Sequence, residues 1–507
     1  MVSEDAVDHE VMIVGAGFSG IGAGIALRRA GFEEFAIVDD AAGFGGAWFW
    51  NRYPGVAVDV PSFSYQFSFA QKPDWTRSYA PGVELRNYAQ ELADAHGLPN
   101  RTFFGRAVTG ARFDEAANLW EVSFADEATW RVRHIIDATG VLTVPKRPDV
   151  AGLDDFAGQT IHTARWDPDI DLSGRRVAII GTGASAVQII PAIADKVAHL
   201  TVFQRTPIWC LPKADVALSP AMQATLRRVP PIRWASRAVS QAFVELQFPV
   251  TAHFHRPLHI TDISKVAAKA FLRSQVRDPE LRAKLTPRYP LGCKRPSFHN
   301  SYLSTYNRPN VTLETDPIER VTTDGVQTAG GVHHQADVLI LATGFKVYEP
   351  GNLPKYPVTG RRGQDLDTWW DENRYRAYQG VSVPGFPNYF FVLGPYAWNG
   401  SSYFNLIENQ TTHMVRCLRH AHSTGANSVE ITERAEQEYF ATMLARRNRQ
   451  VFWQPGCADA NSYYFDRHGD VPLRPGPSVE SAWQSRHFPL SDYAFTTANV
   501  AASRQVS

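Results

Sequence analysis

Two glycine-rich turns in the chain could each hold the phosphates of a dinucleotide. They read Gly15-Ala16-Gly17-Phe18-Ser19-Gly20 and Gly181-Thr182-Gly183-Ala184-Ser185-Ala186. In such a turn the first glycine bends the backbone sharply, the second lets it approach a pyrophosphate, and the third small residue lets a helix pack on a strand. Taken alone, the pattern also fits a tight strand-to-helix turn that binds nothing.

The residue 24 positions after each first glycine distinguishes the two turns. Asp39 lies there after Gly15, where a carboxylate accepts hydrogen bonds from the two ribose hydroxyls of a nucleotide. The same count from Gly181 reaches Arg205, followed by Thr206, and a guanidinium suits a 2′-phosphate. A solvated surface arginine is the alternative for Arg205. We therefore assign FAD to the first turn and NADPH to the second.

The apolar pattern around the turns predicts two β-α-β units. Each unit has a short apolar strand, the glycine turn, a helix-like stretch and a second strand. The ranges are 11–14, 21–29 and 35–38 in the first unit and 177–180, 187–193 and 200–203 in the second. Two further apolar strands, 134–140 and 337–344, both end in Ala-Thr-Gly, and we expect each to close one half of the sheet.

The order of these units predicts an α/β fold with two Rossmann-like domains, the second inserted in the first. A chain of 507 residues exceeds the size of a single hydrophobic core. We expect an FAD-binding domain from 1–150 and 330–507, and an NADP-binding domain from 151–211 and 291–329. Residues 212–290 are expected to form a helical insertion, because glycines are scarce there and apolar residues recur at helical spacing. Its aromatic residues Trp234, Phe243 and Phe248 are expected in a core, with a lid over the substrate as the alternative.

Composition excludes several partners. Lys and Arg together number 51, as do Asp and Glu, so no global field would draw the protein to nucleic acid or to an anionic membrane. The four cysteines show neither paired metal-ligand spacing nor the framework of a small secreted protein, so we expect no metal site and a reducing cytoplasm. The acidic N-terminus lacks the features of a signal peptide, and no apolar run approaches the roughly 20 residues that span a bilayer. A monomer or weak homo-oligomer is expected.

Two longer segments are more specific than the glycine turns. One is Gly45-Gly46-Ala47-Trp48-Phe49-Trp50-Asn51-Arg52-Tyr53-Pro54-Gly55, followed by Asp59. The other, residues 156–167, fits the pattern Phe-x-Gly-x-x-x-His-x-x-x-Trp followed by Pro or Asp, with its fixed positions at Phe156, Gly158, His162, Trp166 and Asp167. Both segments resemble type I Baeyer-Villiger monooxygenases, and the resemblance extends over nearly the whole chain.

The resemblance implies a reaction and a catalytic pair. In that family NADPH reduces the flavin, O2 adds to give a C4a-peroxyflavin, and the peroxide attacks a ketone to yield an ester or lactone. Arg295 matches the family's catalytic arginine, and a guanidinium stays protonated beside a developing oxyanion. Asp59 matches the carboxylate that pairs with it, and Lys294 matches a lysine that contacts the NADP phosphate. Turn capping by Asp59 and an exposed Lys294-Arg295 dipeptide are the alternatives.

Other positions are assigned on the same resemblance. His162 and Trp166 match conformational signals, although a buried, hydrogen-bonded histidine would look the same. A helix beginning near Asn405 could place its N-terminus at the pyrimidine edge of the flavin. The sequence departs from well-known members of the family by carrying Tyr396 and Trp398, which could narrow the ketone pocket. The expected cofactor contacts are Gly15, Gly17, Ser19, Gly20, Asp39, Gly46, Trp48, Asp59, Gly181, Gly183, Ser185, Ala186, Arg205, Thr206, Lys294 and Asn405.

The sequence leaves two other functions open. A flavin monooxygenase that oxidises sulfur or nitrogen shares both nucleotide folds, and Arg295 with Asp59 argues against it. A flavoprotein that senses NADPH without turnover is the third hypothesis.

Overall fold

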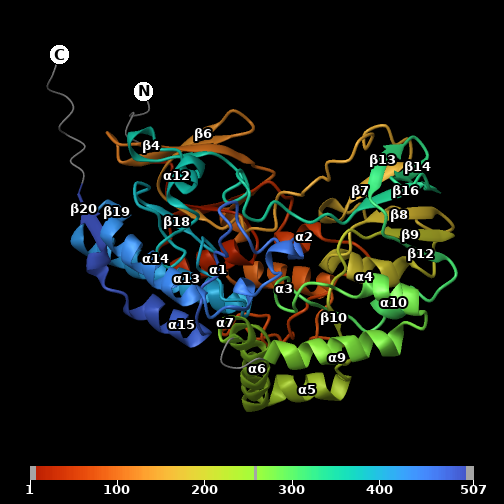
Figure 1. The fold of residues 1–507 in the computed structure, drawn as a ribbon. Helices are drawn as coiled ribbons and strands as arrows, with labels where there is room; N and C mark the ends of the chain where they lie inside the picture. The colour runs from red at the N-terminus through yellow and green to blue at the C-terminus, as the bar shows by residue number, and fades with distance from the viewer. Residues whose placement is uncertain (1–6, 256–259, 498–507) are drawn as a thin grey trace.

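The computed structural model describes residues 7–255 and 260–497, so residues 1–6, which contribute to the expected lack of a signal peptide, lie outside them. Two α/β lobes lie side by side, and a group of helices forms one end of the molecule below them (Figure 1). Within the described residues, no helix is both long and apolar enough to cross a bilayer. The α/β class with two dinucleotide-type sheets is confirmed.

The first sheet carries the first glycine turn. Its main strand order is β17-β4-β5-β6-β1-β2-β3, with β18 beside β6. The strands are β1 (His9–Val14), β2 (Phe35–Asp39), β3 (Thr102–Phe104), β4 (Val108–Asp114), β5 (Leu119–Phe124), β6 (Thr129–Asp137), β17 (Val358–Thr359) and β18 (Tyr389–Phe391). Strand β1 runs parallel to β2 and β6, as the predicted β-α-β unit requires. Helix α1 (Phe18–Ala30) covers the sheet beside α3 (Gly82–Ala95) and the long α13 (Tyr403–Thr424).

The second sheet carries the second glycine turn. Its order is β12-β9-β8-β16-β7, from β7 (Gln159–His162), β8 (Arg176–Ile180), β9 (His199–Phe203), β12 (Val311–Glu314) and β16 (Val338–Leu341), with α4 (Ala184–Ile193) after β8. Strand β16 pairs in parallel with both β8 and β7, and Val338 lies opposite Val177. The domain boundary expected at residue 330 is therefore wrong, because β16 is a buried central strand of the second sheet. The chain returns to the first sheet only after Leu341.

The helical insertion is confirmed, but its aromatic side chains are placed differently from the prediction. It contains α5 (Pro220–Arg228), α6 (Pro230–Glu245), the π-helical turn η3 (Leu246–Val250), α7 (Thr251–His253), α9 (Ile260–Gln275) and α10 (Pro279–Leu285). Trp234 is 57% exposed and Phe243 is 47% exposed, so the expectation that they lie in a core is wrong. Phe248 is half-buried. The spacing of apolar residues predicted that all three residues lie on helices, but it did not indicate which side of each helix faces solvent.

The remaining elements are shorter or pack at the periphery. The short elements include α2 (Ala47–Trp50), α11 (Tyr302–Thr305) and the paired strands β10 (Cys210–Leu211) and β11 (Ser297–Phe298). A three-stranded sheet contains β13 (Ile318–Thr322), β14 (Gly325–Thr328) and β15 (His333–Gln335). The C-terminal third adds α12 (Leu366–Asn373), β19 (Ser428–Ile431), α14 (Glu433–Arg447), α15 (Ser478–His487) and β20 (Tyr493–Thr496). Strands β19 and β20 pair in antiparallel fashion.

Candidate active site between two dinucleotide turns

The first glycine turn has no room for side chains. Gly15 has φ +114°, and a Cβ there would lie 2.6 Å from the Ala138 carbonyl oxygen. A Cβ on Gly46 would lie 2.9 Å from the Cα of Gly17, so the two segments touch through their backbones. Helix α1 begins at this turn with neither an acidic first turn nor a side-chain cap. Its first N–H groups therefore remain available to an anion, as a pyrophosphate requires.

Asp39 lies beside this turn at the end of β2. Its carboxylate accepts hydrogen bonds from the backbone N–H groups of Ala16 at 2.5 Å and Ala41 at 2.7 Å. Burial raises its pKa, and the two backbone hydrogen bonds oppose that rise. Ser19 lies 2.6 Å from the Tyr403 hydroxyl, oxygen to oxygen, which connects α1 to the start of α13. The predicted nucleotide-binding residues of the first unit are thus brought together, and they fit an adenosine ribose and its pyrophosphate.

The second glycine turn has the same backbone form as the first, but the space around its second glycine is more open. Gly181 has φ +110°, and a Cβ there would lie 2.5 Å from the Ala342 carbonyl oxygen, whereas a Cβ on Gly183 would meet nothing within 4 Å. Helix α4 also begins with no acidic first turn and no side-chain cap. Ala186 is buried against the sheet and Ser185 is half-buried. The turn can therefore accept a second pyrophosphate.

Two cations lie close together beyond this turn. Burial lowers the pKa of Lys294, and the nearby charge of Arg205 lowers it further. Neither has an ion-pair partner among the residues that the structure describes. Next to Arg205, the Thr206 carbonyl accepts a hydrogen bond from the Thr182 hydroxyl at 3.0 Å. Two neighbouring cations without a counterion suit a phosphate monoester such as the 2′-phosphate of NADPH.

Arg295 and Asp59, which are far apart in the sequence, form an ion pair. The Arg295 Nε donates to Asp59 Oδ2 at 2.8 Å, with 21% and 31% of the two side chains exposed. Burial alone would raise the pKa of Asp59, but the charge of Arg295 and its hydrogen bond bring it below its usual value. Burial likewise opposes the charge on Arg295, whereas Asp59 raises the pKa of that guanidinium well above its usual value. The arginine is therefore a fixed cation, as the resemblance implied.

The segment from Gly45 to Asp59 connects the two lobes, a role that the motif alone did not reveal. A Cβ on Gly55 would lie 2.7 Å from the Gln188 carbonyl oxygen, so the backbone of this segment packs directly on α4. The Ala57 N–H donates to Gln188 Oε1 at 2.8 Å. Trp48 Nε1 donates to the hydroxyl of the half-buried Tyr65 at 3.2 Å, and Tyr65 was not identified from the sequence.

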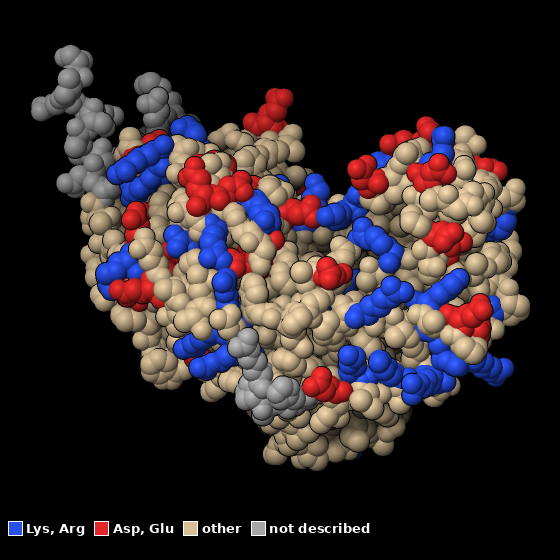
Figure 2. All heavy atoms as spheres, viewed as in Figure 1, with Lys and Arg blue, Asp and Glu red and all other residues tan. Residues whose placement is uncertain are grey.

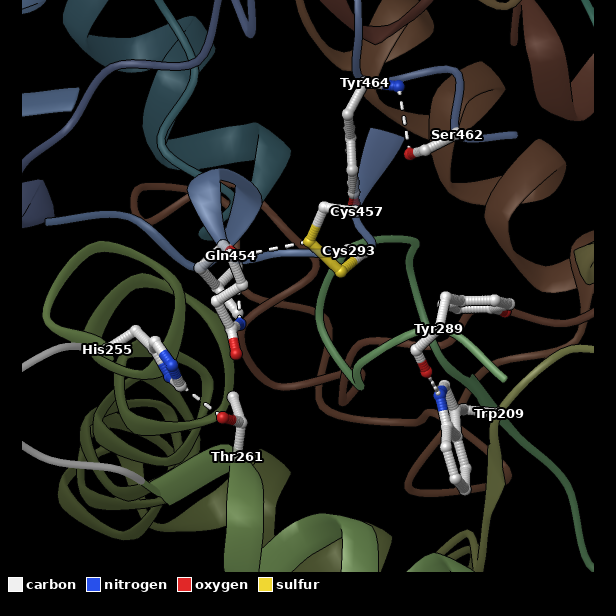
Figure 3. Close-up of a disulfide and its surroundings, with 10 residues drawn as sticks. Trp209, His255, Thr261, Tyr289, Cys293, Gln454, Cys457, Ser462 and Tyr464 are labelled. Atoms are coloured by element: carbon white, nitrogen blue, oxygen red, sulfur yellow. Dashed lines mark hydrogen bonds between the residues drawn. A yellow bond between two sulfur atoms is a disulfide. The ribbon is translucent and has the colours of Figure 1, made fainter. Parts of the chain in front are cut away.

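A C-terminal segment reaches the arginine through a disulfide that was not predicted. Cys293 and Cys457 are paired with their Cα atoms 5.0 Å apart, although 164 positions separate them in the chain (Figure 3). The same segment brings Tyr464 and Tyr463 near Arg295, and both affect the pKa of the guanidinium. The buried Tyr464 hydroxyl has no hydrogen-bond partner of normal geometry among the described residues. No sequence spacing could have identified this arrangement, because the two cysteines approach only in the folded chain.

Aromatic side chains form a wall near Arg295. The Arg295 Cζ lies 6.0 Å from the centre of the Trp398 ring. Phe248 from η3 stacks on Trp398 at 6.2 Å between centroids and meets the edge of Tyr464 at 6.1 Å. Tyr396, which we expected to narrow the pocket, instead packs on Phe440 in a small core. Phe248 also packs against a small buried cluster that contains Phe452 and Tyr464, so its position agrees with the core expectation and leaves the lid alternative open.

The fingerprint residues form a connection into the second sheet. A Cβ on Gly158 would lie 2.6 Å from the Phe156 ring, so the glycine permits the ring to fold over the backbone. The His162 Nδ1 accepts from the Ala164 N–H at 3.1 Å, and burial lowers the pKa of this histidine. Trp166 is buried, whereas Asp167 is exposed and accepts from the Asp169 N–H at 3.0 Å. These contacts agree with a local structural role.

Asn405 lies in the first turn of α13, as expected. Its Oδ1 accepts a hydrogen bond from Arg237 Nη2 at 3.1 Å, and Arg237 comes from α6 of the insertion. Ser402 Oγ donates to the Ser64 carbonyl at 2.6 Å just before the helix. The helix start is thus held by contacts from two distant segments of the chain.

Known proteins are similar to this chain in both sequence and architecture. Residues 12–245 match the family described as pyridine nucleotide-disulphide oxidoreductase. A Baeyer-Villiger monooxygenase of Streptomyces coelicolor is 36% identical over 493 residues, which cover 97% of this chain and 93% of the relative. The structure of cyclohexanone monooxygenase from Rhodococcus sp. Phi1 bound to NADP+ superposes with a TM-score of 0.85 at 29% identity, covering 97% of this chain and 100% of that one. The OTEMO complex with FAD and NADP gives a TM-score of 0.84 at 28% identity, covering 95% and 97%. The chain is therefore a member of the Baeyer-Villiger monooxygenase family of oxidoreductases.

Proposed function

We propose that this protein binds FAD at the first glycine turn and NADPH at the second, and that it uses O2 to convert a ketone into an ester or lactone. Family membership supports the reaction class. The observation that carries the proposal is the ion pair of Arg295 with Asp59, which holds a permanent cation in place. Such a cation stabilises negative charge that develops on oxygen in a site from which water is excluded.

Each residue has a distinct task in this proposal. Asp39 would accept the ribose hydroxyls of FAD, and the glycines of both turns would let backbone N–H groups face the phosphates. Arg205 and Lys294 would bind the 2′-phosphate of NADPH. Arg295 would hold the reacting oxygen as an anion, and Asp59 would orient Arg295. The flavin, when bound, supplies the redox chemistry that no side chain can provide.

The same assignment extends to the domains. We assign the sheet around β1 to FAD and the sheet around β8 to NADPH, with the helical insertion covering one end of the site through Phe248. The wall of Phe248, Trp398 and Tyr464 is apolar on the side of the rings, which favours an apolar ketone. Arg295 would supply the hydrogen-bond donors near the carbonyl oxygen of the ketone.

Product analysis with labelled oxygen tests the proposal. The protein loaded with FAD is supplied with NADPH, isotopically labelled O2 and a panel of cyclic, aryl and long-chain ketones, together with a thioether. We expect an ester or lactone that contains one labelled oxygen. The Arg295→Met variant keeps the side-chain volume without the charge, and we expect it to oxidise NADPH while releasing hydrogen peroxide instead of ester. Sulfoxide from the thioether with no ester from any ketone would overturn the assignment in favour of heteroatom oxidation.

We also propose that the protein acts in the cytoplasm as a monomer or weak homo-oligomer. Cytoplasmic thiols are usually kept reduced, so the Cys293–Cys457 disulfide would persist there because both cysteines are buried. Cell fractionation, with alkylation of thiols under acid and mass spectrometry of each fraction, tests this proposal. We expect the protein in the cytoplasmic fraction with its disulfide intact, and its absence from that fraction would contradict the location. Light scattering after size exclusion measures the oligomeric state.

A further inference from the structure

The helical insertion exposes several large apolar side chains. On α6 and the start of η3, Val239 is 72%, Trp234 57%, Leu246 54% and Phe243 47% exposed. Similar exposure on α9 and the α6 N-terminus is found at Ile263 (73%), Val266 (69%) and Ile232 (41%). Trp234 lies on another side of α6, and we refer to the other six residues as the insertion face. A single exposed apolar residue is ordinary, but a concentration of them at one end of a protein marks an interaction surface.

The geometry of α6 shows that this exposure is systematic. Positions 232, 235, 239, 242 and 246 follow the helical period, and all five are exposed. The buried residues of α6 are Ser240 and Val244, and Ser240 lies 2.8 Å from Ser64, hydroxyl to hydroxyl. The helix therefore buries only Ser240 and Val244 and turns its apolar stripe outward, whereas a helix that packs only on its own protein covers such a stripe.

The insertion is also strongly basic. Residues 212–290 contain 13 Lys and Arg against 5 Asp and Glu, a net charge of +8, in a chain whose overall charge is zero. Lys265, Lys269 and Arg273 follow one another at intervals of four along α9, and none has an ion-pair partner among the described residues. Figure 2 shows a row of basic side chains beside an end of the molecule that carries almost no charge. That end is formed by α5 and α6 (Figure 1).

We propose that the insertion face binds an anionic lipid surface. The apolar side chains of α6 and α9 would enter the boundary between headgroups and acyl chains, and the basic residues of α9 would contact the anionic headgroups. The global charge balance hides this basic region, which is why composition indicated no attraction to anionic membranes. A second copy fits the face less well, because a symmetric contact would bring like charges together.

Vesicle flotation with the full-length, FAD-loaded protein tests the proposal. Vesicles of phosphatidylcholine alone are compared with vesicles that contain about 30% phosphatidylglycerol, at about 0.05 M and about 0.5 M salt. We expect flotation with the anionic vesicles, at least roughly tenfold above the neutral ones, and a marked loss at high salt. Absence of flotation with either composition would overturn the proposal.

Two variants and a matched control locate the contact. Val239→Ser with Phe243→Ser removes apolar area, and Lys265→Glu with Lys269→Glu reverses charge. We expect each pair to reduce flotation roughly tenfold or more while bound FAD and the far-ultraviolet circular dichroism stay unchanged. Val479→Ser with Trp483→Ser is the control, because these residues of α15 are 74% and 60% exposed. Equal losses in the control would instead indicate non-specific hydrophobic adsorption. A concentration-dependent dimer that is abolished by Val239→Ser with Phe243→Ser would instead indicate a self-association surface.

Discussion

Arg295 Nε donates to Asp59 Oδ2 at 2.8 Å although 236 positions separate the two residues in the chain. Asp59 and Arg295 come to the site on different segments of the chain. Asp59 follows the segment that packs on α4, and Arg295 follows Cys293, which is tied to the C-terminal segment. The charge at the centre of the site thus depends on three distant parts of the sequence.

Replacing Asp59 by Asn should uncouple NADPH oxidation from ester formation. The variant keeps the shape but leaves Arg295 without its counterion, and hydrogen bonds to charged groups contribute about 1.5–3 kcal/mol. We expect ester formation to fall roughly 10- to 100-fold while hydrogen peroxide rises, measured by product analysis and a peroxide assay. Asp126→Asn, in the exposed pair with Arg106, is the control. Unchanged coupling in Asp59→Asn would remove this pair from the mechanism.

Replacing Arg205 by Ala should weaken the use of NADPH far more than the use of NADH. The guanidinium lies beside Lys294 with no acidic partner among the described residues, so a phosphate is its expected ligand. We expect kcat/KM for NADPH to fall roughly 10- to 100-fold and kcat/KM for NADH to change less than about threefold. The exposed Arg320 of β13 provides the control variant Arg320→Ala. Equal losses of kcat/KM for both nucleotides would mean that Arg205 does not bind the 2′-phosphate.

Replacing Cys457 by Ser should loosen the segment that carries Tyr464. The disulfide closes a loop of 164 residues, and loss of such a crosslink typically costs about 2–5 kcal/mol of folding free energy. We therefore expect a lower urea midpoint and a lower ester-to-peroxide ratio. Treatment of the wild type with reductant should reproduce both effects, and treatment of the variant should change neither. A variant with full coupling would show that the tether does not position Tyr464.

Replacing Glu436 by Gln should remove part of the pH dependence of stability. Burial raises the pKa of Glu436 to about 7 against the weaker opposing charge of Arg376, whose Nε lies 3.5 Å from the carboxylate. Since its pKa in the folded state exceeds the unfolded value of 4.5, this group stabilises the fold at low pH. That contribution, up to about 3 kcal/mol, is lost as pH rises through 7. We expect Glu436→Gln to raise the Tm at pH 8 and to flatten the decline between pH 5 and pH 8, as calorimetry would show. A parallel decline in both proteins would assign the effect to another group, such as Asp137, whose pKa burial also raises to about 7.

The local features of the chain were predictable from the sequence. Both glycine turns, Asp39 at the end of β2 and the helices of the insertion depend on neighbours within about 25 residues. In those stretches the period of apolar residues and the backbone freedom of glycine are sufficient to define a strand, a turn and a helix. The positions of Arg295 and Asp59 were also identified, but only through the resemblance to a family and not through spacing.

The sequence by itself therefore determined that two dinucleotide turns exist and which charge follows each of them. Tertiary structure alone decided that Val338–Leu341 joins the second sheet, that Cys293 meets Cys457, and that α6 turns its apolar side outward. The physical reason is that strand order, long-range pairing and the direction of a helix face depend on what packs against an element. An apolar period reveals that a helix has two sides, but only its neighbours decide which of them is covered.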